Sequence, residues 1–148
     1  MNMEKKEVLK MLNNWGTDTL MRTLGIEYTD FGDDWVEAEM PVNGRVHQPL
    51  GLLHGGATAA LAESVASAGS ALFINREKQA ALGIDLQATH LKSMRQGKVI
   101  ARGTLLHKGR SIHLWEIDIR NENGDRVCHS KLTTLIVPRR KEPDAGGQ

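Results

Sequence analysis

The chain begins with apolar residues at helical spacing. Between about Glu4 and Leu24 they recur every three or four positions, which predicts one or two short helices with a break around Gly16. The positions are Val8, Leu9, Met11, Leu12, Leu20, Met21 and Leu24. We expect these helices to pack as a lid or end cap.

Beyond Gly25 the period changes to two. Polar and apolar residues alternate from Trp35 to Met40, and Pro41 ends the run, which predicts a strand. Further strand-like runs follow at about 81–91, 98–106, 112–120 and 126–137. The segment NENGD joins the last two runs, and its Asn-Gly pair is a strong signal for a hairpin.

A different pattern separates the first strand from the others. The segment from His54 to Phe73 is rich in alanine and leucine and contains no proline. It is long enough for a helix of roughly 30 Å. One long helix among strands predicts an α+β fold, with a mostly antiparallel sheet wrapped around a central helix.

This helix contains one acidic residue, Glu63, and no lysine or arginine. Leu61, Val65, Ala68 and Leu72 form one apolar stripe, and Glu63 projects roughly opposite. An average helix glutamate faces solvent or meets an arginine. Here small residues surround the carboxylate, which favours a partly buried group with a raised pKa, suited to act as a general base or nucleophile.

The helix starts with His54, Gly55 and Gly56. None of the usual capping residues directly precedes Gly55, so we expect free backbone N–H groups that could bind a developing oxyanion. A glycine pair more often marks a turn, and a lone histidine is more often structural. Glu63 lies nine residues after His54, so a complete site requires a second chain or an adjacent loop.

Composition sets broad limits. The 148 residues, 40% of them hydrophobic, suit one domain over 1–137, and the polar tail at 138–148 is typical of disorder. The net charge of +1 gives no electrostatic case for binding nucleic acid or an anionic membrane. The N-terminus lacks the apolar core of a signal peptide, which favours the cytoplasm. Cys128 lies in an alternating run and is interpreted as a packed strand residue.

The segment QPLGLLHGGATAALAES, from Gln48 to Ser64, resembles the signature of hotdog-fold acyl-CoA thioesterases. It is most similar to the subgroup with 4-hydroxybenzoyl-CoA and 1,4-dihydroxy-2-naphthoyl-CoA hydrolases. The resemblance covers about Lys10 to Val137 and includes GDDWVEAEMPV, GIDLQATHLKS, HKGRSIHLWEIDI and KLTTLIV. It implies hydrolysis of an acyl-CoA with an aryl or other bulky acyl group, without a cofactor.

The resemblance also implies roles for individual residues. Glu63 matches the catalytic carboxylate, which acts as a nucleophile through a mixed anhydride or as a base that activates water. Gln48 and His54 match side chains beside the thioester, the Gly55 N–H matches the donor to its carbonyl, and Ser67 matches a hydroxyl of the site. The residues implied for coenzyme A are Gly83, His90, Leu91, Lys92, Ser93, His107, Lys108, Gly109, Arg110, Ser111 and Ile112.

Three of these residues, Lys92, Lys108 and Arg110, are cations that could meet phosphate. A charged loop between strands is nevertheless ordinary surface in most proteins. His90 and His113 have no neighbouring ligands at a zinc spacing, so we expect no metal.

The expected assembly is a homodimer that pairs into a homotetramer. The resemblance implies that two subunits join their sheets and place their helices side by side, so that each site takes Glu63 from one chain and the glycine turn from the other. Three other functions stay open. They are a proofreading thioesterase for acyl carrier protein, a dehydratase acting on a hydroxyacyl thioester, and a noncatalytic acyl-CoA-binding protein.

Overall fold

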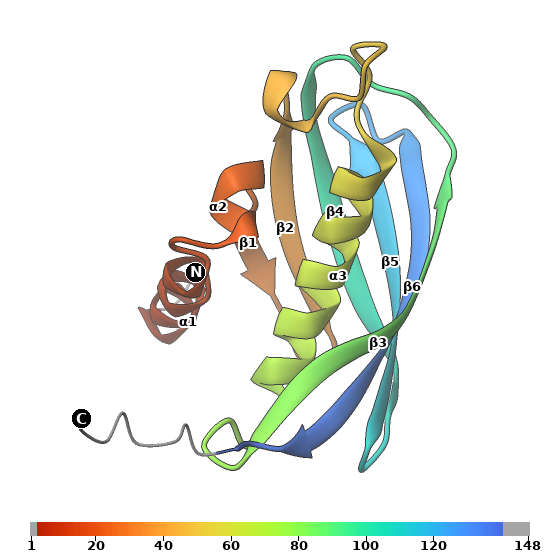
Figure 1. The fold of residues 1–148 in the computed structure, drawn as a ribbon. Helices are drawn as coiled ribbons and strands as arrows, with labels where there is room; N and C mark the ends of the chain where they lie inside the picture. Colours follow the sequence, from red (N-terminus) through yellow and green to blue (C-terminus); the bar gives the residue numbers. More distant parts are fainter. Residues whose placement is uncertain (1–2, 141–148) are drawn as a thin grey trace, which may run out of the picture.

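The computed structural model describes residues 3–140. Helix α3 (Gly55–Leu72) lies across one antiparallel sheet, whose strand order is β1-β2-β4-β5-β6-β3 (Figure 1). The strands are β1 (Glu27–Phe31), β2 (Trp35–Val42), β3 (Gln79–His90), β4 (Gly97–Lys108), β5 (Ile112–Asn121) and β6 (Arg126–Pro138). The predicted α+β arrangement, an antiparallel sheet around one long helix, is confirmed.

Two helices precede the sheet, as predicted. Helix α1 (Met3–Trp15) ends before Gly16, and helix α2 (Leu20–Leu24) begins after Thr19, whose hydroxyl accepts a hydrogen bond from the Met21 N–H (3.3 Å). Gly25 ends α2 with a φ of 74°, a left-handed conformation that favours glycine. The two helices lie beside β1 and α3 on one side of the molecule (Figure 1).

Strand β1 was not predicted as a separate element. It pairs with β2, and the side chain of Asn13 on α1 bonds both the N–H and the C=O of Tyr28 (2.8 and 3.0 Å). Helix α1 therefore provides hydrogen-bond partners for backbone groups on the open edge of β1. Burial alternates along β2 as predicted, but the strand continues to Val42, so the prediction that Pro41 ends it is wrong. The pairing of β2 with β1 stops at Glu39. Beyond Glu39 one side of β2 has no partner strand, and a proline is tolerated there because it has no N–H to donate to a neighbouring strand.

The other four strands begin and end within two residues of their predicted bounds. The expected hairpin joins β5 to β6, and a short 3-10 helix, η1 (Gly44–Val46), follows β2. Pro138 ends β6, and the backbone N–H of Arg139 bonds the carbonyl of Lys78 (2.8 Å). Residues 141–148 of the predicted tail lie outside the described residues.

Helix α3 packs against β2 to β6 through small residues. Leu61, Val65 and Ala68 of the predicted apolar stripe are buried. At Gly69 an added Cβ would overlap the indole ring of Trp115, so glycine allows the helix to lie close to the sheet. No helix within residues 3–140 is both long and apolar enough to span a bilayer.

Candidate active site

Glu63 lies midway along α3 and is half-buried. Its carboxylate makes no hydrogen bond or ion pair with any residue from 3 to 140. The carboxylate lies over Gly83 of β3, where an added Cβ would overlap Oε1 and stand 3.2 Å from the carboxyl carbon. Two predicted site residues, from different elements, are thus brought together, and the absence of a side chain at position 83 leaves room for the carboxylate.

A pocket of about 490 Å³ adjoins Glu63 on the side of the N-terminal helices. Glu63 and Ser67 line it from consecutive turns of α3. The Ser67 hydroxyl has no hydrogen-bond partner within the described part of the chain. The juxtaposition of Glu63 and Ser67 that the resemblance implied is therefore present.

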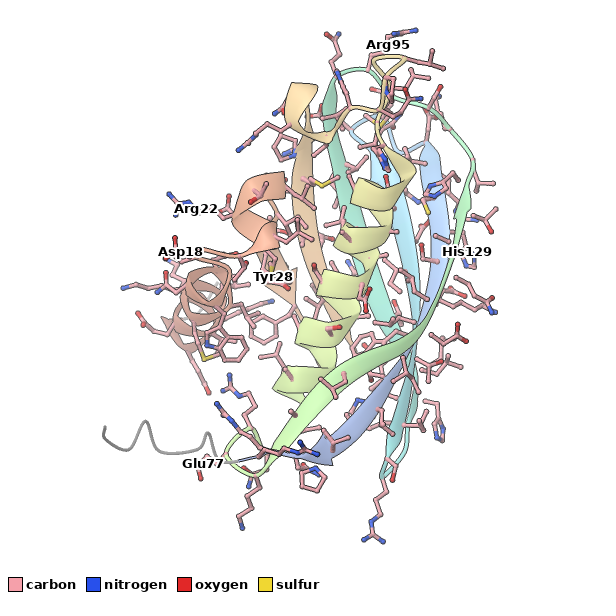
Figure 2. All side chains as sticks on the ribbon, viewed as in Figure 1. Asp18, Arg22, Tyr28, Glu77, Arg95 and His129 are labelled. Carbon is pink, nitrogen blue, oxygen red and sulfur yellow. The ribbon has the colours of Figure 1, made fainter. Side chains whose placement is uncertain are left out.

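The opposite wall of this pocket comes from α1, α2 and β1, and its contribution was not predicted. Tyr28 lies between the N-terminal helices and α3 (Figure 2), and its hydroxyl donates a hydrogen bond to the Ser64 carbonyl (2.9 Å). Burial raises the pKa of Tyr28, so this hydroxyl stays neutral. The signal in the sequence was the apolar pattern of the first 24 residues, but that pattern does not indicate which element the helices contact.

A second pocket, of about 370 Å³, lies at the N-terminus of α3. It brings together Gln48, Gly55 and the segment from His90 to Ser93, all of them predicted site residues. The His90 ring lies against Gly55: an added Cβ there would be 2.8 Å from Nε2. Within one chain this pocket does not include Glu63.

The expectation of an uncapped helix start is wrong. His54 is the N-cap residue, and its Nδ1 accepts a hydrogen bond from the Gly56 N–H (2.8 Å). The His54 carbonyl accepts from Ala57 and Thr58 (3.0 and 3.2 Å). A neutral imidazole can cap a helix because its unprotonated nitrogen is an acceptor. Gly55 retains the one N–H of this first turn that has no partner among the described residues.

The predicted residues for coenzyme A do not form one groove in a single chain. The segment from His107 to Ile112 joins β4 to β5 at the end of the sheet farthest from the start of α3 (Figure 1). Lys108 lies over the Phe73 ring (5.6 Å), and Lys92 pairs with Asp125 (2.7 Å), which lowers the pKa of that carboxyl. Arg110 has no ion pair or hydrogen bond with any described residue.

A buried polar cluster that was not predicted fixes the second half of α3. The hydroxyl of Ser70 accepts from the Trp115 indole N–H (2.8 Å) and bonds the Thr134 hydroxyl (2.8 Å) and Nδ1 of His113 (3.0 Å). Burial, followed by the charges of Lys108 and His107, lowers the pKa of His113. The cluster ties α3 to β5 and β6 in the core.

Cys128 is buried in β6, as predicted, and burial raises the pKa of its thiol. This disfavours the thiolate that a nucleophile requires. Among residues 3–140, no group of three or more His, Cys, Asp and Glu residues is placed to hold a metal ion.

The chain is similar in sequence and in fold to known proteins. Residues 50–128 match the family model described as Thioesterase superfamily. The proofreading thioesterase EntH of Cronobacter turicensis is 46% identical over 129 residues, covering 87% of this chain and 93% of the relative. The solved thioesterase PA1618 of Pseudomonas aeruginosa, a glutamine-to-alanine variant, has a TM-score of 0.87 at 37% identity, covering 88% of this chain and 94% of its own.

A third similar protein is the thioesterase SAV0944 of Staphylococcus aureus, with a TM-score of 0.79 at 36% identity over 80% of this chain and 98% of its own. These likenesses confirm the predicted hotdog fold. The chain belongs to the thioesterase superfamily, and the predicted class of enzyme, a thioester hydrolase, is confirmed.

Proposed function

We propose that the protein hydrolyses an acyl-CoA thioester with an aryl or other bulky acyl group, and that Glu63 is the catalytic carboxylate. The observation that carries the proposal is the unpaired, half-buried carboxylate beside an apolar pocket. A carboxylate with no neutralising partner can accept a proton or attack a carbonyl. Solved variants of SAV0944 add support, because the glutamine and the glutamate replaced in them are 15 positions apart, as are Gln48 and Glu63.

Two mechanisms suit this carboxylate. As a base, Glu63 takes a proton from water while the water oxygen attacks the thioester carbon, and the thiol then leaves with that proton as the C–S bond breaks. As a nucleophile, its oxygen attacks the same carbon, releases the thiolate, and forms a mixed anhydride that water hydrolyses. In both, an oxyanion develops at the carbonyl, and the free N–H of Gly55 is suited to donate to it.

Glu63 and Gly55 lie in separate pockets of one chain, so the proposal includes a homodimer whose sites combine both. The edge strand β3 pairs with β6 alone among the described strands and exposes Leu82 and Ile84 (52% and 54%). An open, apolar strand edge is suited to pair with a second copy. The dimers would then pair into a tetramer, and the enzyme would act in the cytoplasm.

The first test is release of free thiol from a panel of aromatic and aliphatic acyl-CoAs. Glu63→Gln removes the basic oxygen and keeps the shape of the side chain, so we expect a loss of about 10²- to 10⁴-fold in kcat. Glu77→Gln, at an exposed turn, is the matched control and should leave kcat unchanged. Full activity of the Glu63 variant would exclude the proposed mechanism. Labelled oxygen from water found in Glu63 after one turnover would identify the nucleophile route.

A second candidate is proofreading of acyl carrier protein, favoured by the 46% identity to a relative named for proofreading. The reacting thioester is the same on either carrier. The two candidates separate when one acyl group is offered on coenzyme A and on phosphopantetheinylated carrier protein. A kcat/KM at least tenfold higher for the carrier protein would favour the proofreading function.

A further inference from the structure

We propose that the pocket between the N-terminal helices and α3 holds the acyl group of the thioester and selects uncharged acyl groups. This inference rests on the proposed function and adds the substrate class. The pocket has a volume of about 490 Å³, within the usual range for small-molecule sites. An acetyl group would leave most of that space unfilled, whereas an aryl or medium-chain acyl group would use it.

The position of Glu63 fixes the direction of the substrate. Its carboxylate lies over Gly83 on one side and lines the pocket on the other. A thioester carbon placed at the carboxylate therefore has the strand β3 on one side and helices α1 and α2 on the other. The acyl group then extends toward Leu12 and Met21, and the sulfur and its carrier lie on the side of β3.

Most polar side chains of the pocket wall already make hydrogen bonds within the protein. The Thr19 hydroxyl donates to the Gly16 carbonyl (2.7 Å), the Ser64 hydroxyl to the Ala60 carbonyl (2.7 Å), and the Tyr28 hydroxyl to the Ser64 carbonyl (2.9 Å). Apart from the reacting carboxylate, two polar side-chain groups in the described part of the wall lack a hydrogen-bond partner: the Ser67 hydroxyl and the indole N–H of Trp15, which is half-exposed at the rim. The interior of the pocket can thus meet one polar group of an otherwise apolar ligand.

Charge strengthens the assignment. Among residues 3–140, the wall contains no lysine, arginine or histidine, and its single charged residue is Glu63. The Arg76 guanidinium lies over the Trp15 ring at the rim (5.0 Å) but does not line the pocket. An acyl group with a terminal carboxylate inside the pocket would therefore lie near a like charge with no cation in the described wall, which is costly in an apolar site. Trp15 and Leu20 are large apolar side chains at the rim, 50% and 61% exposed. A bound acyl group would cover this apolar surface, whose exposure to water is otherwise unfavourable.

The test compares acetyl-, hexanoyl-, benzoyl- and glutaryl-CoA with the wild type, Ala71→Leu and Leu20→Lys. Ala71 lines the pocket, and leucine suits a helix while it fills space. We expect Ala71→Leu to lower kcat/KM for hexanoyl- and benzoyl-CoA at least tenfold and for acetyl-CoA less than about threefold. Arg22→Leu adds the same side chain on α2 outside the pocket (Figure 2) and should not change the preference.

Leu20→Lys tests the charge argument at an exposed position, where folding is not at risk. It should raise the ratio of glutaryl- to hexanoyl-CoA hydrolysis about tenfold or more. An equal effect of Ala71→Leu on all acyl groups, an unchanged ratio in Leu20→Lys, or wild-type preference for glutaryl-CoA would overturn the pocket assignment. Absence of thiol release from every substrate by folded wild type would instead overturn the proposed function.

Discussion

At the scale of single residues, the site depends on the absence of a side chain and of a charged partner beside Glu63. Position 83 has no side chain, and neither α3 nor the facing strand provides a cation or donor for the carboxylate within the described residues. A half-buried charge without a partner costs free energy, so a glutamate that served only the fold is expected to have a hydrogen-bond or ion-pair partner. The unpaired carboxylate is therefore better explained by a substrate that occupies the space.

The contact with Gly83 gives a prediction. Gly83→Ala adds a methyl group where Oε1 now lies, so the carboxylate must rotate away from the thioester. We expect kcat to fall at least tenfold with a smaller change in KM, because positioning of the reacting group is lost while most substrate contacts stay. Gly44→Ala is the matched control, since a Cβ there meets no atom within 4 Å. An unchanged kcat in Gly83→Ala would show that the carboxylate adopts another position during catalysis.

At the scale of elements, the orientation of α3 depends on the Ser70 cluster. Ser70 lies seven residues, or about two helical turns, after Glu63. The two side chains therefore project in nearly the same direction from the helix axis. Its partner Thr134 is paired in register with Gly83 on one side and with His113 on the other. The bonds that fix α3 to the sheet thus lie in the same cross-strand row as the glycine beneath Glu63.

The burial of His113, a member of this cluster, should make the stability of the protein depend on pH. The pKa of His113 is lowered in the folded protein, so below its ordinary value of about 6.5 the unfolded chain binds a proton that the folded chain does not. As the pH falls from 7 through the folded pKa, the free energy of unfolding should decrease by up to about 1.4 kcal/mol per pH unit from this group. His113→Gln should remove that dependence, measured by urea unfolding from pH 7.5 to 5. Equal slopes for both proteins would contradict the assignment.

The elements differ in how far the sequence predicts them. The central helix and β3 to β6 follow from strong local patterns, such as the alanine-rich run without proline and the Asn-Gly turn. Strand β1 has the sequence EYTDF, in which only Tyr28 is buried, so no alternation marks it. Its pairing depends on contacts with β2 and Asn13, which are distant in the chain.

The candidate site likewise contains some residues that the sequence predicts and others that it does not. Glu63 is conspicuous because it is the one charged residue among small neighbours, and the glycine turn at the start of the helix also follows from the sequence itself. Gln48 and Gly83 come from the resemblance alone. The capping role of His54 was missed because a histidine caps a helix only in one rotamer and one tautomer. The wall from α1 and α2 was missed because periodicity gives the apolar face of a helix but not the element against which it packs.

At the scale of the whole molecule, one chain contains two incomplete parts of the proposed site. Glu63 and Ser67 line one pocket, whereas Gln48 and Gly55 line another at the start of α3. The open edge of β3 carries Gly83 and two exposed apolar side chains, so pairing through this edge would bring a second subunit to Glu63. Dimerisation would then complete the site and also cover the exposed edge.

A hybrid dimer tests this arrangement directly. Glu63→Gln and Gln48→Ala chains, each with a different affinity tag, are expressed together and the hybrid is purified through both tags. If each site combines the two residues from different chains, the hybrid has one doubly substituted site and one intact site, so about half of wild-type activity should return. If each chain forms its own site, both sites of the hybrid are defective and activity stays at the level of the two parent variants. Since both models use the same chains, differences in folding cannot produce the recovery.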